Sequence, residues 1–123
     1  MGPTPLPYFV YITASSREEA LAIGRTLVEE RLAACINVLD GMTSLYWWEG
    51  KIEQGNEAVL IAKTRDENVE PLTERVKSLH SYSVPCVIAW PIKHGNDPYI
   101  DWIEENSLPP EDDPSSRRRM GFK

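Results

Sequence analysis

The sequence of 123 residues is poor in the side chains that build disulfides and small metal clusters, with only two cysteines and two histidines. Cys35 and Cys86 lie 51 positions apart and no Cys-x-x-Cys motif occurs, which excludes a zinc ribbon and a thioredoxin-type redox pair. A disulfide framework is not expected at this size and cysteine count. We therefore expect both thiols to be reduced.

Long hydrophobic runs are also missing. The longest uninterrupted apolar stretches span only a few residues, against the roughly 20 that cross a bilayer. The N-terminal sequence MGPTPLPYF has no basic segment followed by an apolar one, as a secretory signal would have. We therefore expect a cytoplasmic protein without membrane association.

Basic residues are outnumbered, with 13 Lys and Arg against 19 Asp and Glu and a formal net charge of −6. This balance argues against general nucleic-acid binding. Neither glycine-rich phosphate motif, G-x-x-x-x-G-K-[ST] or G-x-G-x-x-G, is present. Ser81 and Ser83 flank His80, but sequence neighbours do not define a catalytic geometry, so we expect no enzymatic activity.

The chain divides into one domain between two end segments that lack an apolar pattern. Residues 1–7 contain three prolines, and residues 108–123 are rich in Pro, Asp, Glu, Ser and Arg, so we predict disorder in both segments and a domain over 8–107. Arg117–Arg119 could contact an acidic partner, although a solvated charge run is the simpler interpretation. The role of this tail stays open.

Hydrophobic periodicity predicts the elements of the domain. Tyr8–Thr13 is a strand covered on both faces or nearly so, and a helix over Ser16–Arg31 follows two overlapping Ser-x-x-Glu capping boxes. Apolar residues from Val69 to Leu79 define one face of a second helix. Cys86–Trp90 is a further strand, and a short helix follows with Asp97 at its N-cap and Pro98 at its first position.

The most informative stretch lies between the two long helices and predicts a β-hairpin over Ile36–Trp48 and Ile52–Thr64, with a turn at Glu49–Lys51. Its strands exceed the usual length of about 5–6 residues. Two interpretations are open. A bulge at Asp40-Gly41 could leave the hairpin covered by the chain's own helices, or exposed aromatic residues could form a subunit interface.

The predicted order is β-α-β-β-α-β plus a terminal helix. This order is typical of the α+β ferredoxin-like sandwich, in which both helices cover one face of an antiparallel sheet.

Several motifs in this order resemble the CutA divalent-cation tolerance proteins, over about Tyr8–Glu105. They are Arg31–Asn37, Ser44–Glu53, Lys63-Thr64, His80 with Tyr82 and Val84-Pro85, and Gly95-Asn96 with Tyr99 and Asp101–Ile103. The resemblance implies a tight homotrimer whose long hairpins pair between subunits, with Leu45, Tyr46 and Trp47 at the interface. It implies an assembly similar to the PII signalling proteins, a link to tolerance of copper and other divalent metals, and no general enzymatic activity.

The resemblance also implies candidate metal ligands. Cys35 and His80 match positions implicated in copper binding in the family, whereas Ser83 and Cys86 replace residues that are commonly acidic there, and Ser81 replaces a usual proline. Thiolates suit Cu(I) and imidazoles suit Cu(II) or Zn(II), so convergence of Cys35, His80 and Cys86 would favour Cu(I) or Zn(II), with no metal obligatory. The alternatives are a buried structural thiol at Cys35 and an imidazolium at a helix C-terminus for His80.

A second implied site is a cleft between subunits near Trp48, Lys63 and Tyr82, where a lysine with aromatic neighbours could hold a small anion. Interface packing is the ordinary interpretation of the same residues. Two functions follow. The first is a trimeric protein that binds divalent or soft metal ions in metal tolerance. The second is a PII-like module that binds a small organic or anionic ligand and signals to an unidentified protein partner.

Overall fold

The computed structural model describes residues 5–108. The predicted disordered segments, 1–7 and 108–123, therefore lie largely outside the described residues, although the first strand already begins at Pro7. The elements are β1 (Pro7–Ala14), α1 (Arg17–Glu29), β2 (Cys35–Trp48), β3 (Lys51–Arg65), a short 3-10 helix η1 (Asp66–Asn68), α2 (Val69–Leu79), β4 (Val87–Pro91) and α3 (Asp97–Asn106).

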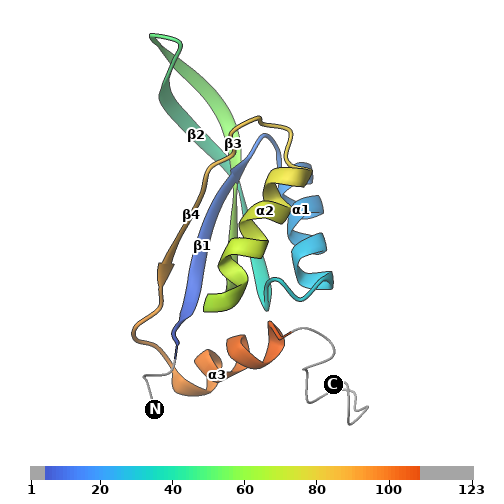
Figure 1. Cartoon of the computed structure of the whole chain (residues 1–123). Helices are drawn as coiled ribbons and strands as arrows, with labels where there is room; N and C mark the ends of the chain where they lie inside the picture. The colour runs from blue at the N-terminus through green and yellow to red at the C-terminus, as the bar shows by residue number, and fades with distance from the viewer. Residues whose placement is uncertain (1–4, 109–123) are drawn as a thin grey trace.

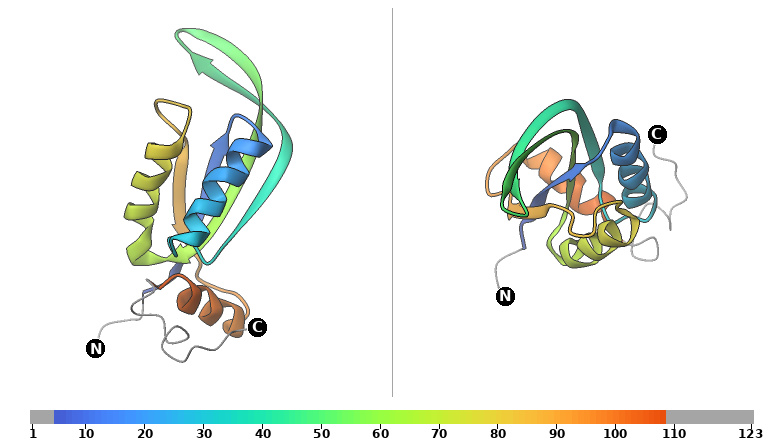
Figure 2. Two further views of the ribbon diagram at one scale, coloured as in Figure 1. Left: turned by 90° about the vertical axis from the view of Figure 1, so that its right-hand side faces the viewer. Right: turned by 90° about the horizontal axis from the view of Figure 1, so that it is seen from above.

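The four strands form an antiparallel sheet in the order β2-β3-β1-β4. Helices α1 and α2 lie side by side on one face, and α3 lies at the lower end of the sheet (Figures 1 and 2). This arrangement is the predicted ferredoxin-like α+β sandwich. No helix of the described part is long and apolar enough to cross a membrane.

The two faces of the sheet differ in how they are covered. Val10, Ile12 and Leu60 point toward the helices and belong to the fully buried core. Since alternate residues of a strand point to opposite faces, Phe9 and Tyr11 lie on the other side, which we call the open face. Both are only half-buried in one chain, so β1 is covered on its second face less than predicted.

Helix α1 begins where the capping motif predicts and ends earlier than predicted. Ser16 is the N-cap, and its side chain accepts a hydrogen bond from the backbone N–H of Glu19 at 3.1 Å. The helix stops at Glu29 because Arg31 adopts φ of 62°, a left-handed conformation that usually falls to glycine after a helix. The predicted end at Arg31 is therefore wrong by two residues.

Several other boundaries differ from the prediction by one residue. Strands β1 and β3 extend one residue further at each end, and β2 begins one residue earlier, at Cys35. The N-cap of α3 is Asn96, and Asp97 is already helical. Strand β4 starts at Val87, which leaves Cys86 in the loop that follows α2.

The β2-β3 hairpin projects well beyond the helices and the other strands (Figure 1). Glu49 and Gly50 form its turn with φ of 50° and 79°, as a two-residue hairpin turn of type I′ requires. The register shifts between Leu39 and Met42, and Gly41 takes φ of 79° at this bulge. The predicted bulge is therefore present, but the helices do not cover the hairpin beyond it.

Candidate functional site

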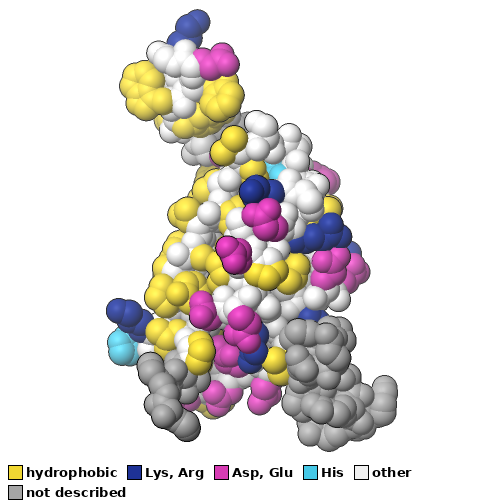
Figure 3. All heavy atoms as spheres, in the orientation of Figure 1, with side chains coloured by type: hydrophobic (Ala, Val, Ile, Leu, Met, Phe, Trp, Pro, Cys, Tyr) yellow, Lys and Arg dark blue, Asp and Glu magenta, His cyan; other side chains and the backbone are white. Residues whose placement is uncertain are grey.

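The outer part of the hairpin exposes large apolar side chains. We call Leu45, Tyr46, Trp47, Trp48 and Ile52 the hairpin surface; all five are exposed, with Leu45 at 66% and Trp47 at 72%. Figure 3 shows hydrophobic side chains on both sides of the projecting tip. Further exposed apolar residues continue onto the open face at Leu39, Ile88 and Trp90. Consecutive residues of β2 point to opposite faces, so these side chains expose apolar surface on both faces of the hairpin. Large exposed apolar surfaces are typical of interaction sites.

His80 is a structural residue in this chain. Its side chain is 0% exposed, Nε2 lies 2.7 Å from the carbonyl oxygen of Thr13, and Nδ1 accepts a hydrogen bond from the backbone N–H of Tyr82 at 3.0 Å. This pattern assigns a neutral imidazole that donates through Nε2–H. Because the Nδ1 lone pair is already occupied, a metal ion could bind only by breaking one of these bonds.

Cys86 lies at the same end of the sheet, in the exposed loop before β4. Partial burial raises the pKa of the Cys86 thiol, a hydrogen bond with Thr13 works against this rise, and the carboxylate of Glu57 adds to it. The thiol is therefore close to a carboxylate.

Cys35 lies at the opposite end, beside Lys63 and Tyr99. Its sulfur is 3.6 Å from the Tyr99 hydroxyl and 3.9 Å from Lys63 Nζ. Lys63 Nζ also donates to Asn37 Oδ1 at 3.2 Å and to the Tyr99 hydroxyl at 3.3 Å. We call Cys35, Asn37, Lys63 and Tyr99 the lysine cluster.

The three predicted metal ligands do not converge within one chain. Cys35 pairs across the sheet with Lys63 and through it with Phe9, whereas His80 contacts Thr13, four residues or about 13 Å further along β1. Within residues 5–108, no group of three or more His, Cys, Asp or Glu side chains could hold a metal ion. A mononuclear site from Cys35, His80 and Cys86 of one chain does not fit this fold.

The predicted cleft residues are also apart in one chain. Trp48 pairs with Lys51 at the hairpin tip, twelve residues and about 40 Å of strand from Lys63. The Tyr82 hydroxyl instead donates to Glu57 Oε2 at 2.8 Å near the base of the hairpin.

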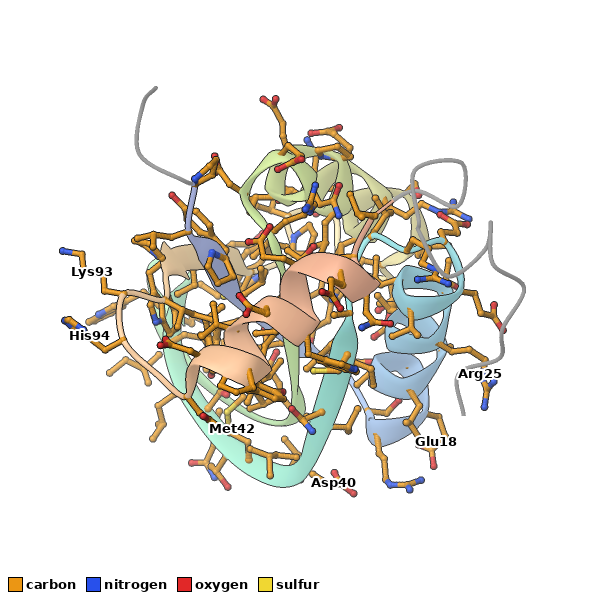
Figure 4. The ribbon with its side chains drawn as sticks, turned by 90° about the horizontal axis from the view of Figure 1, so that it is seen from below. Glu18, Arg25, Asp40, Met42, Lys93 and His94 are labelled. Carbon is orange, nitrogen blue, oxygen red and sulfur yellow. The ribbon has the colours of Figure 1, made fainter. Side chains whose placement is uncertain are left out.

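His94, the other histidine, is exposed in the loop before α3 and points away from the sheet with Lys93 (Figure 4).

Two carboxylates organise the loop between α2 and β4. Glu19 accepts four hydrogen bonds, from the backbone N–H and hydroxyl of Ser15 and from those of Ser81, at 2.7–3.0 Å. Burial alone would raise the pKa of Glu19, but these bonds together lower it to about 2. Burial and the hydrogen bond to Glu57 raise the pKa of Tyr82 above its ordinary value.

Sequence reasoning missed Asn37, Tyr99, Glu19 and Glu57. Asn37 had a signal, since it follows Cys35 by two positions and therefore shares its sheet face. Glu19 was identified only as a capping residue. Tyr99 and Glu57 had no local signal, because their hydrogen-bond partners lie 13 or more positions away in the sequence.

The fold and surfaces described above define a class of protein: a small ferredoxin-like α+β domain with an elongated, apolar-tipped hairpin and no metal cluster within its described residues. The family model for the CutA1 divalent ion tolerance proteins matches residues 8–106. The chain belongs to this family.

Known relatives agree in sequence and in structure. Divalent-cation tolerance protein CutA of Thermus thermophilus is 48% identical over 98 residues, which cover 80% of this chain and 95% of that relative. A solved Thermus thermophilus structure, titled divalent cation tolerance protein (Cut A1), has a TM-score of 0.80 at 46% identity, over 82% of this chain and 98% of that one. An Archaeoglobus fulgidus structure, titled periplasmic divalent cation tolerance protein CutA, has a TM-score of 0.81 at 45% identity and covers 84% and 100%.

The names of the relatives mention different cellular compartments. Besides the periplasmic title above, the Arabidopsis thaliana relative is named Protein CutA, chloroplastic; it is 45% identical over 98 residues, which cover 80% of this chain and 54% of that relative. The cytoplasmic location of the present chain stays a prediction from its sequence.

Proposed function

We propose that this chain is a non-enzymatic homotrimer that binds divalent or soft metal ions and acts in divalent-cation tolerance. The proposal of a homotrimer rests on the hairpin surface, whose five large apolar side chains are exposed in one chain. Monomeric soluble proteins rarely expose this many large apolar side chains on one short segment. A second copy of the chain is the occupant that the family resemblance favours, and the names of the relatives support the role in cation tolerance.

The assembly is tested by a matched pair of substitutions. Trp47→Gln removes an exposed hairpin side chain, whereas Leu79→Gln removes an apolar side chain of α2 that is 37% exposed on the helix side of the molecule. We expect native mass spectrometry at micromolar concentration to find a trimer for the natural chain and for Leu79→Gln, and smaller species for Trp47→Gln. A monomeric natural chain would refute the proposal.

The metal ion is cargo in this proposal, and its donors come from more than one subunit. Cys86 is the better donor of the two thiols. It is exposed and lies near the Glu57 carboxylate, whose negative charge attracts a cation. Cys35 has the Lys63 ammonium 3.9 Å from its sulfur, and this charge repels a cation. Thiolate donors favour Cu(I) and also suit Zn(II).

Ion counting tests this assignment. The reduced, metal-free protein is titrated with Cu(I), Cu(II) and Zn(II), and bound ions per trimer are counted by native mass spectrometry. We expect Cys86→Ser to abolish stoichiometric uptake and Cys35→Ser to leave it unchanged. Uptake that depends on Cys35 instead would overturn the choice of donor, and no stoichiometric uptake by the natural chain would overturn the metal proposal.

A second candidate function is the binding of a small anionic ligand at Lys63. It is favoured by one observation: among residues 5–108, Lys63 Nζ hydrogen-bonds neutral groups and forms no ion pair with a carboxylate. A half-buried ammonium without a counter-charge is suited to an anion. The Tyr99 ring, 5.6 Å from Nζ, would border such a ligand.

Melting temperatures separate the two candidates, since a ligand stabilises the folded state that binds it. We expect Cu(I) or Zn(II) to raise the melting temperature of the natural chain more than of Cys86→Ser. Small carboxylates or nucleotides that raise it in the natural chain but not in Lys63→Gln would favour the PII-like alternative.

A further inference from the structure

The bulge in β2 contains the dipeptide Asp40-Gly41. It is the only Asp-Gly pair in the sequence, and the pair Asn-Gly does not occur. The register shifts between Leu39 and Met42, so Asp40 and Gly41 together face one residue of β3, Ala58. An extra residue of this kind is left without a cross-strand partner. The backbone at Asp40-Gly41 is therefore less constrained than that of the paired strand on either side.

The backbone nitrogen of Gly41 lies beside the carboxyl group of Asp40. Its N–H donates to Asp40 Oδ1 at 2.8 Å, so the nitrogen is close to Cγ, the carbon that bears this oxygen. Two atoms are well placed to react when they are held about 3–3.5 Å apart. A bond from this nitrogen to Cγ closes a five-membered ring, the cyclic imide through which aspartate and isoaspartate interconvert.

The surroundings leave room for this ring. Gly41 has φ of 79° and no side chain, and within the described part of the chain only its sequence neighbours lie within 4 Å of the position that a Cβ atom would occupy. Asp40 is exposed and projects outward from β2 (Figure 4). Because glycine allows a close approach to its backbone, nothing on Gly41 shields the nitrogen from the carboxyl group.

The site does not depend on exposure of the open face. Leu39 lies on that face, and since successive residues of a strand point to opposite sides, Asp40 points away from it. The ring closure joins two atoms of one chain and needs only water and solvent protons. A homotrimer that covers the open face and the hairpin surface therefore leaves the reacting groups in place.

We propose that Asp40-Gly41 is a modification site at which aspartate converts spontaneously to isoaspartate. The Gly41 nitrogen attacks Asp40 Cγ, so an N–C bond forms and one carboxyl C–O bond breaks. The departing oxygen takes the amide proton and a proton from solvent and leaves as water. A second water adds to the main-chain carbonyl carbon of the imide, the bond from this carbon to nitrogen breaks, and the new carboxyl group returns a proton to solvent. One water leaves and one enters, so the mass is unchanged and nothing is oxidised or reduced.

The product changes the main chain at the point where the hairpin leaves the covered part of the sheet. The chain then runs through Cβ and Cγ of residue 40, which adds one methylene between Leu39 and Gly41, and the former main-chain carbonyl carbon becomes a free carboxylate. Strand register is specified by the alternation of side chains along the main chain. An added main-chain atom disturbs this alternation, so we expect the isomerised chain to melt at a lower temperature.

The experiment uses the full, assembled protein and needs no metal ion, so it is independent of the proposed function. The protein is incubated in mildly acidic buffer at 37 °C, folded or unfolded in guanidinium, and its peptides are examined by electron-transfer fragmentation, which distinguishes isoaspartate from aspartate. Asp97 is the internal control, because the nitrogen of Pro98 carries no proton and cannot close the ring.

We expect isoaspartate to form at position 40 and not at position 97, and to form in the folded protein at least as fast as in the unfolded chain. Absence of isoaspartate at position 40, or formation that is much slower in the folded protein, would overturn the proposal. An isomerised fraction, separated by chromatography, that melts at the same temperature as the unmodified protein would overturn the expected effect on the hairpin.

Two variants test the ring closure and keep Gly41, whose positive φ disfavours other residues. Asp40→Glu retains the negative charge but requires a larger ring, so we expect loss of the modification. Asp40→Asn closes the same ring with ammonia as the leaving group, so we expect faster formation of isoaspartate. Unchanged circular dichroism spectra report that both variants fold. Modification that persists in Asp40→Glu, or that becomes slower in Asp40→Asn, would contradict this mechanism.

Discussion

The hydrogen bonds around Glu19 predict a specific dependence of stability on pH. Glu19 lies at the start of α1, and its carboxylate connects Ser15 to Ser81 in the loop after α2. The side chain is 15% exposed, so solvent screens these bonds only in part. We predict that Glu19→Gln destabilises the folded state at neutral pH and removes much of the stability change in mild acid.

The magnitude follows from the pKa of Glu19, which the hydrogen bonds lower from 4.5 to about 2. One pKa unit corresponds to about 1.4 kcal/mol, so the ionised carboxylate adds at most about 3 kcal/mol, and residual exposure reduces this to about 2 kcal/mol. Because the folded-state pKa lies below the unfolded-state value, this contribution is complete above about pH 5. It is lost as the pH falls through 4.5 toward 2.

The assay is guanidinium unfolding followed by circular dichroism at pH 7, 5, 4 and 3, with all proteins at the same concentration because an oligomer's stability depends on it. Glu18→Gln is the matched control, since Glu18 is the exposed neighbour that points to solvent (Figure 4). We expect Glu18→Gln to follow the natural chain. A Glu19→Gln variant that loses stability between pH 5 and 3 as steeply as the natural chain would refute the reasoning.

Two further predictions concern the same end of the sheet. His80→Ala removes the groups that contact the Thr13 carbonyl and the Tyr82 N–H, so unfolding experiments should find a loss of about 2 kcal/mol, while the number of ions bound stays unchanged; a lost ion with unchanged stability would contradict this. Tyr82→Phe should remove the highest-pH step of the phenolate absorbance titration, because burial and Glu57 raise the pKa of Tyr82. As this folded-state pKa exceeds the ordinary 10.0, the stability contributed by Tyr82 is complete below pH 10 and is lost above it; an unchanged titration would disprove this.

The elements of the fold could be predicted from the sequence because their signals are local. The Ser16 cap, the apolar spacing of α2 and the Glu49-Gly50 turn each depend on residues a few positions apart. The end of α1 was missed for a local reason as well. Arg31 occupies the left-handed position where glycine is the usual signal, so the sequence carried no warning of the helix end.

The length of the hairpin and its aromatic residues were also sufficient to predict an exposed surface. Strands longer than the rest of a small sheet must project beyond it, whatever the packing of the helices. The exposure of Trp47 confirms this part of the prediction.

The candidate site was decided by the tertiary structure. The sequence identified the imidazole and thiol groups by residue type. Whether His80 has a lone pair available for a metal ion depends on its hydrogen bonds to Thr13 and Tyr82. Thr13 is distant in the sequence, so its contact with His80 could not be predicted. Cys35 meets Tyr99 across 64 positions because α3 packs under the sheet. Periodicity tells which face of an element a side chain occupies, and it carries no information about which distant element covers that face. For this reason the sequence by itself determined the elements, the family and the projecting hairpin, and only the packed structure separated Cys35 from His80 and Cys86 and joined it to Lys63.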